Sequence, residues 1–293
     1  MSAGCPADEA PVLVIGLGTM GLPIALRLNA ASFCVWGMDS RPDVREALPG
    51  PNARVLASGS VCDAVHASRA ATVITCVSDE TALQRLWQAP GGLCEALVTG
   101  LCVIDHTTTA IPTARRFAAD AAQAGAMWVD APLSGAAAGA RAGTLSAMLG
   151  GDPRAVEHAR PLLSAYCATI THLGPAGAGQ AGKLTNQIAI AGINAGLLAA
   201  TGFASLQGLD LGGCFDAMTA GSAQSVQMAQ HRAALTREPA DGACFDWLQR
   251  DLALALAHLP VDGPTASDAS QAVLGRLLAL NRVFNGTAAS PLL

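Results

Sequence analysis

The 293-residue chain is 51% hydrophobic and 13% charged, and its formal net charge is −5. This length allows two domains, and the composition excludes disorder because it provides a large buried interior. The 17 Lys and Arg residues are spread thinly and only 4% of residues are aromatic, which excludes a nucleic-acid-binding surface. The N-terminal stretch MSAGCPADEA has no basic start and no apolar run, so we expect a cytoplasmic protein without a signal peptide.

The cysteines are odd in number and scattered, with no C-x-x-C pair: they stand at 5, 34, 62, 76, 94, 102, 167, 214 and 244. This spacing fits neither a disulfide framework nor a zinc site. We therefore expect free, mostly buried thiols and no metal.

Short β-favouring runs alternate with alanine-rich helical stretches over residues 1–174. This pattern is typical of a parallel sheet with helices on both faces. The sequence therefore predicts an α/β fold with a Rossmann-type doubly wound sheet. The predicted strands are Val12–Ile15, Phe33–Met38, Thr72–Cys76, Cys102–Ile104, Met127–Val129, Ser146–Leu149 and Thr169–His172.

The first predicted strand runs directly into a G-x-G-x-x-G pattern formed by Gly16, Gly18 and Gly21. In such a turn the first glycine reverses the chain, the second lets backbone amides reach a pyrophosphate, and the third lets the helix pack closely on the sheet. Asp39 ends the second strand, 18 residues after Gly21, where a carboxylate accepts hydrogen bonds from ribose hydroxyls. Together these features predict a dinucleotide site.

Residues 175–293 carry helical patterns and no convincing strand, which predicts an all-α second domain joined to the first by a long helix. The predicted helices are Ala181–Gly208, Cys214–Ala220, Ser225–His231, Trp247–His258 and Ser267–Asn281. The stretch from Leu184 to Leu209 has no charge and is long enough to cross a bilayer. Because polar residues and glycines interrupt it, we expect a helix buried inside a soluble protein and no membrane association.

Lys183 opens this uncharged helix, with Asn186 and Gln187 at i+3 and i+4 on nearly the same face. Buried amides and a nearby nicotinamide cation would lower the pKa of the Lys183 ammonium. The amine could then exchange a proton with a substrate hydroxyl near neutral pH. The alternative is a lysine at a helix end that extends into solvent.

Ser134 and Gly135 directly follow a predicted strand, at the sheet edge where ligands bind in open α/β folds. The Ser134 hydroxyl and the amides of Gly135 and Ala136 could hold a carboxylate, although an ordinary turn is the alternative. Asp130, just before them, is interpreted as a structural cap. Thr107 and Thr108 follow the fourth strand, where hydroxyls could contact the nicotinamide side of the coenzyme.

Arg250 and Asp251 interrupt an otherwise apolar helix. They form either a surface ion pair or, with the arginine reaching the site, a cation for an anionic substrate. His106 and the other histidines lack the spacing of a catalytic triad or a metal site, so we expect them to be structural or exposed.

Four separated stretches give the chain a resemblance to the β-hydroxyacid dehydrogenase family: GLGTMGLPIALRL, DAPLSGAAAGARAGTLSAMLGG, GAGQAGKLTNQ and RDLALAL. They stand in the family's order and cover nearly the whole chain. The family includes 3-hydroxyisobutyrate dehydrogenase, tartronate semialdehyde reductase and threonate dehydrogenase. The resemblance implies hydride transfer between NAD(P) and a small β-hydroxy acid, a helical domain like that of 6-phosphogluconate dehydrogenase, and a homodimer or homotetramer formed through that domain.

The resemblance also implies roles for single residues. Lys183 matches the family's catalytic lysine, which acts as acid and base at the hydroxyl or carbonyl oxygen, and Asp251 matches the acid of its C-terminal Lys-Asp pair. The predicted substrate contacts are Ser134, Gly135, Ala136, Asn186, Gln187 and Arg250. The predicted coenzyme contacts are Gly16, Leu17, Gly18, Thr19, Met20, Gly21, Asp39, Ser40, Val77, Thr107, Thr108 and Asp251.

Three residues depart from the family pattern. Ala136 replaces the second glycine of the usual S-G-G, Gln187 replaces an asparagine common in hydroxyisobutyrate enzymes, and Arg250 replaces a lysine. An arginine favours bidentate recognition of a carboxylate. These changes leave the identity of the hydroxy acid open.

The coenzyme is predicted to be NAD, because this chain has Asp39–Ser40 where NADP-preferring relatives tend to have Asn-Arg. A carboxylate accepts two ribose hydroxyls and repels a 2′-phosphate. Arg41, two positions on, keeps NADP possible.

The predicted reaction needs no metal, because Lys183 and the coenzyme charge supply the polarisation. Closure of the helical domain is expected to exclude water. Two alternatives are an imine-type reductase, whose members usually lack the lysine, and a non-catalytic NAD-binding scaffold.

Overall fold

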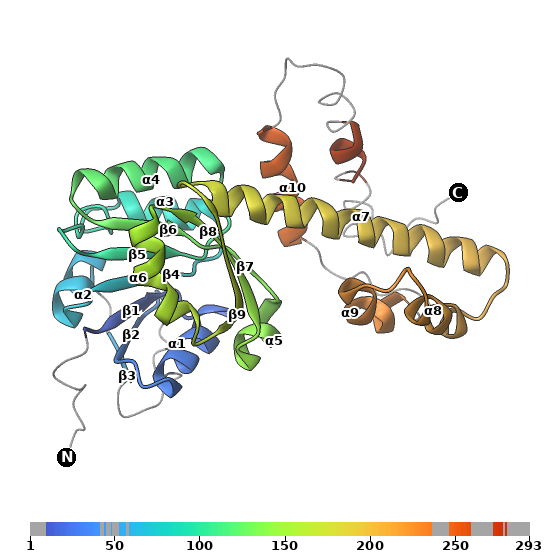
Figure 1. The fold of residues 1–293 in the computed structure, drawn as a ribbon, viewed down its shortest axis with the longest axis horizontal. Coiled ribbons are helices and arrows are strands. Elements are labelled where there is room, and N and C mark those ends of the chain that lie inside the picture. Colours follow the sequence, from blue (N-terminus) through green and yellow to red (C-terminus); the bar gives the residue numbers. More distant parts are fainter. Residues whose placement is uncertain are drawn as a thin grey trace. The chain divides into compact units, whose positions relative to one another are not determined.

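The computed structural model describes residues 10–41, 44, 48, 53–56, 59–235, 246–258, 272–277 and 279. The chain divides into two compact units, Met1–Lys183 and Leu184–Leu293. The division falls inside the long helix α7 (Ala178–Leu206), later than the boundary expected at residue 174 from glycine density. Figure 1 shows the elements of both units with their labels.

The first unit contains a nine-stranded sheet in the order β3-β2-β1-β4-β5-β6-β8-β7, with β9 paired to β8. The first six strands are parallel, whereas β8 runs antiparallel to β6 and β7. This order is the doubly wound arrangement, whose ligand site lies at the switch point between β1 and β4. The strands are β1 (Val12–Ile15), β2 (Val35–Met38), β3 (Ala53–Val55), β4 (Thr72–Thr75), β5 (Cys102–Asp105), β6 (Met127–Asp130), β7 (Leu133–Ser134), β8 (Leu145–Gly151) and β9 (Cys167–Gly174).

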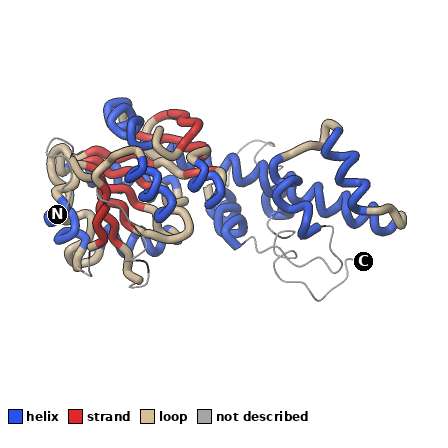
Figure 2. The backbone as a smooth tube through the Cα atoms, turned by 90° about the horizontal axis from the view of Figure 1, so that it is seen from below, coloured by secondary structure: helices blue, strands red, loops and turns tan. Residues whose placement is uncertain are grey.

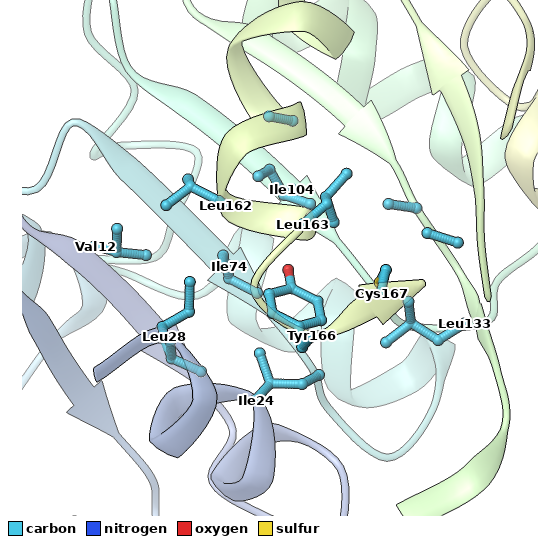
Figure 3. Close-up of a cluster of buried hydrophobic side chains, with 14 of the residues drawn as sticks. Val12, Ile24, Leu28, Ile74, Ile104, Leu133, Leu162, Leu163, Tyr166 and Cys167 are labelled. Atoms are coloured by element: carbon cyan, nitrogen blue, oxygen red, sulfur yellow. The ribbon is translucent and has the colours of Figure 1, made fainter. Parts of the chain in front are cut away.

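Both faces of the central parallel strands β1, β4 and β5 are buried under helices. In β1, Val12 and Val14 belong to one apolar cluster and Leu13 and Ile15 to the other, as the alternation of side chains along a strand requires. Figure 3 shows the first cluster around Tyr166. The helices of the first unit are α1 (Gly21–Ala30), α2 (Val61–Ser68), α3 (Glu80–Gln88), α4 (Ile111–Gln123), α5 (Ala136–Ala142) and α6 (Pro153–Leu163).

Helices α1 and α6 supply side chains to the first cluster, and α2, α3 and α4 supply side chains to the second. The predicted fold class is therefore confirmed. Two strands were not predicted: β3 has three residues behind a Pro- and Gly-rich stretch, and β7 has two, so neither is long enough to show a β pattern.

The described part of the second unit is helical, and Figure 2 shows its helices and the strands of the first unit in contrasting colours. It contains most of α7 together with α8 (Leu211–Ala220), α9 (Val226–Leu235) and α10 (Asp246–Ala257), and residues 272–277 are also helical. The rest of the helix predicted at Ser267–Asn281 lies largely outside the described residues.

Helix α7 is long and apolar enough to cross a membrane by length and composition alone. Only 22% of its most apolar window is buried. The expectation of a helix enclosed by its own chain is therefore wrong for this chain taken singly. The smaller apolar clusters of the second unit, around Leu248 and Leu252 and around Phe215, leave much of α7 exposed.

The cysteine prediction needs one correction. Cys34 takes part in a disulfide bond, whereas Cys62, Cys76, Cys94, Cys102, Cys167 and Cys214 are free. Among the residues that the structure describes, no three His, Cys, Asp or Glu side chains gather into a group that could hold a metal ion.

Candidate active site

The glycine turn after β1 leaves no room for side chains at two of its positions. A Cβ atom on Gly16, whose φ is +92°, would lie 2.3 Å from the carbonyl oxygen of Cys76, and one on Gly21 would lie 1.8 Å from the carbonyl oxygen of Gly16. Around Gly18 the nearest atom to such a Cβ is the Arg41 Nη2, 3.9 Å away. The turn is thus closed on its inner side and open, beside a guanidinium, where a pyrophosphate would approach.

Helix α1 begins directly behind this turn. Within the described residues, no side chain caps its start at Met20. Its first amides and the positive end of its dipole therefore suit an anion. These observations fit a dinucleotide, which Gly16–Gly21 would hold at its pyrophosphate.

Asp39, at the end of β2, is tied to the same turn. Its Oδ2 accepts a hydrogen bond from the Leu17 amide at 2.8 Å, and its Oδ1 accepts from the Arg41 amide at 2.9 Å and from Arg41 Nε at 3.1 Å. Burial would raise the pKa of Asp39, but the hydrogen bonds from Arg41 and Leu17 outweigh it and the pKa is lowered. Asp39 is therefore ionised near neutral pH. It is already paired with Arg41, the residue that keeps NADP possible as the coenzyme.

The loops after β4 and β5 are held together by one buried carboxyl. Asp105 Oδ1 accepts from Thr75 Oγ1 at 2.7 Å and from the Thr107 amide at 3.0 Å. The Thr107 hydroxyl in turn accepts from the Val77 amide at 3.3 Å. Val77 and Thr107, both predicted coenzyme contacts, thus belong to one network at the carboxyl edge of the sheet.

His106, next to Asp105, has a structural role, as expected. Its Nδ1 lies 2.7 Å from the Ala131 carbonyl oxygen and its Nε2 lies 2.9 Å from the Tyr166 hydroxyl. Burial lowers the pKa of His106 to about 4, so the ring is neutral. A neutral ring that donates to Ala131 accepts from Tyr166.

Asp130 confirms its predicted role as a cap. Its Oδ1 accepts from the Gly177 amide at 2.8 Å and its Oδ2 accepts from the Gln180 amide at 3.0 Å, at the start of α7. Gly179 lies so close to the sheet that a Cβ atom there would be 2.5 Å from the carbonyl oxygens of Asp130 and Met148. The turn that leads to Lys183 is therefore fixed against β6 and β8.

Lys183 is 8% exposed. This burial contradicts the alternative in which the lysine extends into solvent. The sequence holds a further signal, which was missed: of the 17 Lys and Arg residues, Lys183 is the only lysine. Arginine replaces lysine as a cation, but it cannot lose its proton in a protein. A single buried lysine in a chain that otherwise uses arginine points to a task that needs a titratable amine.

The Ser134 loop has an unusual backbone. Ser134 ends β7 opposite Ser146 and is half-buried, whereas Gly135 and Ala136 are exposed. Gly135 has a φ of +123° and Ala136 a φ of +53°. Ala136 thus has a left-handed backbone conformation. This conformation costs alanine more free energy than it would cost the glycine that the family usually has at this position.

In the second unit, Gln187 links two other predicted site residues. Its Oε1 accepts from Asn186 Nδ2 at 3.2 Å, and its Nε2 donates to Asp251 Oδ2 at 2.5 Å. Gln187 and Asp251 are buried, Asn186 is half-buried and Arg250 is exposed on α10. Gln187 therefore orients Asn186 and Asp251.

Two residues of this region were missed by sequence reasoning. Asp105 and Gln180 are fully buried, and each joins segments that are far apart in the chain, Asp105 through Thr75 and Gln180 through Thr107. A carboxylate directly after the predicted strand Cys102–Ile104 was the available signal for Asp105. No signal in the sequence indicated Gln180.

A doubly wound sheet with a glycine turn at its switch point, a carboxylate at the end of the second strand and a buried lysine are together typical of dinucleotide-dependent oxidoreductases. The comparisons agree. Residues 11–174 match the family model of the NAD-binding domain of 6-phosphogluconate dehydrogenase, and residues 177–271 match that of the NAD-binding domain of NADP-dependent 3-hydroxyisobutyrate dehydrogenase.

Among curated proteins, the chain is 34% identical to an uncharacterized oxidoreductase of Shewanella frigidimarina, over 86% of this chain and 88% of that protein. It is 36% identical to an NAD-dependent L-serine dehydrogenase of Pseudomonas aeruginosa, over 68% and 65%. A solved structure of Mycobacterium tuberculosis 3-hydroxyisobutyrate dehydrogenase with L-serine is 26% identical, has a TM-score of 0.75, and is matched over 94% of its chain and 92% of this one.

The chain belongs to the β-hydroxyacid dehydrogenase family. It is an NAD(P)-dependent hydroxyacid dehydrogenase.

Proposed function

We propose that the protein oxidises a small β-hydroxy acid, or reduces the matching semialdehyde, with Lys183 as the acid and base. The observation that carries this proposal is the single lysine of the chain, buried at the start of α7 next to an anchored turn. When bound, NAD(P) supplies a nicotinamide carbon that accepts or gives the hydride. Gly16–Gly21 would hold its pyrophosphate, Asp39 and Ser40 its ribose, and Val77, Thr107 and Thr108 its nicotinamide side.

In the oxidation direction, the neutral amine of Lys183 accepts the proton of the substrate hydroxyl, and in reduction the ammonium returns it. Ser134, with the amides of Gly135 and Ala136, binds the carboxylate of the substrate. Asn186 orients the hydroxyl end of the substrate, and Gln187 holds Asn186. Arg250 and Asp251 complete the substrate and coenzyme contacts from α10.

Two relatives narrow the substrate class. One relative is named as an L-serine dehydrogenase, and one solved 3-hydroxyisobutyrate dehydrogenase holds L-serine. L-Serine and 3-hydroxyisobutyrate are both short acids with the hydroxyl on the β carbon. Glycerate, which pairs with tartronate semialdehyde, is the third candidate.

The experiment is a panel of L-serine, 3-hydroxyisobutyrate, glycerate and a cyclic imine, each assayed with both coenzymes. We expect turnover of a hydroxy acid and none of the imine. Lys183→Met and Lys183→Arg should each lose about 10²–10⁴-fold in kcat, while NADH binding, followed by its fluorescence, stays close to the wild type. Imine reduction without hydroxy-acid oxidation, or near-normal turnover in Lys183→Arg, would overturn the proposal.

We also propose that the protein is a cytoplasmic homodimer or homotetramer in which a second copy covers α7. The support is an uncharged, exposed face on this helix. Ile193, Phe203 and Leu206 are exposed there, and a Cβ atom on Gly192 or Gly196 would meet nothing within 4 Å. Small residues let two helices approach closely, and larger apolar side chains beside them add buried area.

A further inference from the structure

Gln180 joins the start of α7 to the loop that follows β5. Its Nε2 donates to the Thr107 carbonyl oxygen at 2.8 Å, and its Oε1 accepts from the Thr109 amide at 3.0 Å. The side chain is completely buried. A primary amide donates and accepts at the same time, so neither an apolar side chain nor an ionised carboxylate can make both bonds.

The same helical turn is fixed on its other side by Asp130, which accepts from the Gly177 and Gln180 amides. Gly179 lies so close to the Asp130 carbonyl oxygen that the turn leaves no room there for a side chain. Gln180 therefore connects two rigid parts: an anchored helix start and a loop whose Thr107 is bonded to Asp105 and Val77.

Lys183 stands three residues after Gln180 in the same helix, so the two side chains lie on neighbouring positions of one helix surface. We propose that Gln180 is a positioning residue that sets the distance between the Lys183 amine and the Thr107–Thr109 loop on the coenzyme side. This inference rests on the proposed roles of Lys183 and Thr107. It implies that the amine and the coenzyme loop move as one body.

A single lysine makes the test direct, because protein grown on lysine labelled with ¹³C at the ε carbon gives one signal, that of Lys183. The signal is titrated with saturating NAD and again with saturating NADH, whose nicotinamides differ by one positive charge. In the wild type the pKa of Lys183 should be lower with NAD than with NADH, because a cation held nearby disfavours the ammonium. In Gln180→Met this difference should shrink by about half or more, since Coulomb interactions weaken with distance.

Ser68→Ala is the matched control. Ser68 is also buried, and its hydroxyl likewise donates one hydrogen bond to a backbone carbonyl, that of Val65, and accepts one from a backbone amide, that of Ala70. Ser68→Ala loses two hydrogen bonds, as Gln180→Met does, but at a position far from α7 in the sequence. It should therefore keep the full difference in the pKa of Lys183 between NAD and NADH. An unchanged difference in Gln180→Met, or no difference in the wild type, would overturn the proposal.

Gln180→Glu serves if Gln180→Met does not fold. A protonated glutamic acid reproduces both hydrogen bonds, whereas the ionised form sets a carboxylate oxygen against the Thr107 carbonyl oxygen. Its turnover relative to the wild type should therefore fall as the pH rises, and a ratio independent of pH would contradict the proposal. If the wild type oxidises no hydroxy acid, the proposed function is wrong. The NMR titration needs no turnover, so it still tests the role of Gln180.

Discussion

Asp105 and Asp130 are register partners at the ends of the parallel strands β5 and β6, and both side chains are fully buried. Burial raises the pKa of Asp105 to about 7 and that of Asp130 to about 6. Their other contacts differ. Asp130 accepts backbone amides at both oxygens, whereas Asp105 Oδ2 has no hydrogen-bond partner in the described structure. The last proton to leave the pair therefore belongs to Asp105.

Asp105→Asn should remove a pH dependence of stability. The folded wild type keeps the Asp105 proton up to a pH of about 7, whereas the unfolded chain releases it near its ordinary pKa of 3.8. The folded state thus binds more protons between these values, and the free energy of unfolding falls as the pH rises through this window. The loss over the whole window is on the order of 4 kcal/mol.

Urea unfolding at pH values of about 5 and about 8 measures this effect. The asparagine variant should lose less stability than the wild type between the two. His106 binds its proton less readily when folded and contributes the opposite slope, but it does so in both proteins and cancels in the comparison. Equal losses in variant and wild type would show that Asp105 is ionised when buried.

Asp130→Asn should destabilise the protein by about 1–3 kcal/mol, because an asparagine oxygen can accept from one of the two α7 amides while its NH₂ group faces the other. Asp210→Asn is the matched control, since Asp210 caps α8 through the Gly213 amide but is exposed to solvent. Its cost should be close to zero, because asparagine and aspartate are about equally good N-cap residues. Equal costs in urea unfolding would contradict the anchoring role of Asp130.

Ala136→Gly should stabilise the protein by about 0.5–1 kcal/mol, because alanine pays for the left-handed conformation and glycine does not. Arg69→Gly is the control: Arg69 has the same φ of +53°, at the end of α2 and outside the predicted site. Both variants should unfold at a higher temperature. Ala136→Gly should also keep the KM for the hydroxy acid, because the amide proposed to bind the carboxylate is retained, and a large rise in KM would require another role for the Ala136 methyl group.

The sequence was sufficient for features that depend on local pattern. The glycine turn and Asp39 are defined by spacing, and most strands of the parallel sheet appear as apolar runs such as Val12–Ile15 and Cys102–Ile104. Features that depend on long-range contacts could not be predicted. Gln180 acts on a loop some 70 residues earlier, and only the folded chain brings them together.

The burial of the helices in the second unit was harder to predict. The composition of an apolar helix does not show whether its own chain or a second copy of the chain covers it. The buried helix expected from Leu184 to Leu209 is one instance. The bond between Gln187 and Asp251 is another feature that local pattern could not predict, because the two residues are 64 positions apart in the chain.

Phe203→Glu should weaken the assembly proposed for α7. Phe203 is 65% exposed in the single chain, so the substitution should have little effect on the stability of one chain. In an assembly the carboxylate would lose its hydration, at a cost of several kcal/mol. Sedimentation velocity should show a shift from dimer or tetramer toward monomer, with Leu26→Glu, an exposed apolar residue of α1, as the control that keeps the wild-type mass. A wild type that is already monomeric would contradict the proposed assembly.

Asp39 and Arg41 should control the choice of coenzyme in opposite directions. Arg41 engages both carboxylate oxygens of Asp39 and also reaches the Leu17 carbonyl oxygen, so in this structure the carboxylate is partly neutralised by its neighbour. Ribose hydroxyls and Arg41 therefore compete for Asp39, whereas a 2′-phosphate would attract Arg41 and be repelled by Asp39. Arg41→Ala should raise the ratio of kcat/KM for NAD over NADP, and Asp39→Ala should lower it.

Each change should amount to roughly tenfold or more, the effect of one charged hydrogen bond worth about 1.5–3 kcal/mol. Arg54→Ala, which removes an exposed arginine from β3 that lies over the Trp36 ring, controls for the loss of positive charge on this side of the sheet and should leave the ratio unchanged. Steady-state kinetics with both coenzymes at fixed hydroxy acid gives the ratio. If Arg41→Ala lowers the ratio instead, then Arg41 serves NAD, and the ion pair with Asp39 is part of the ribose site rather than its competitor.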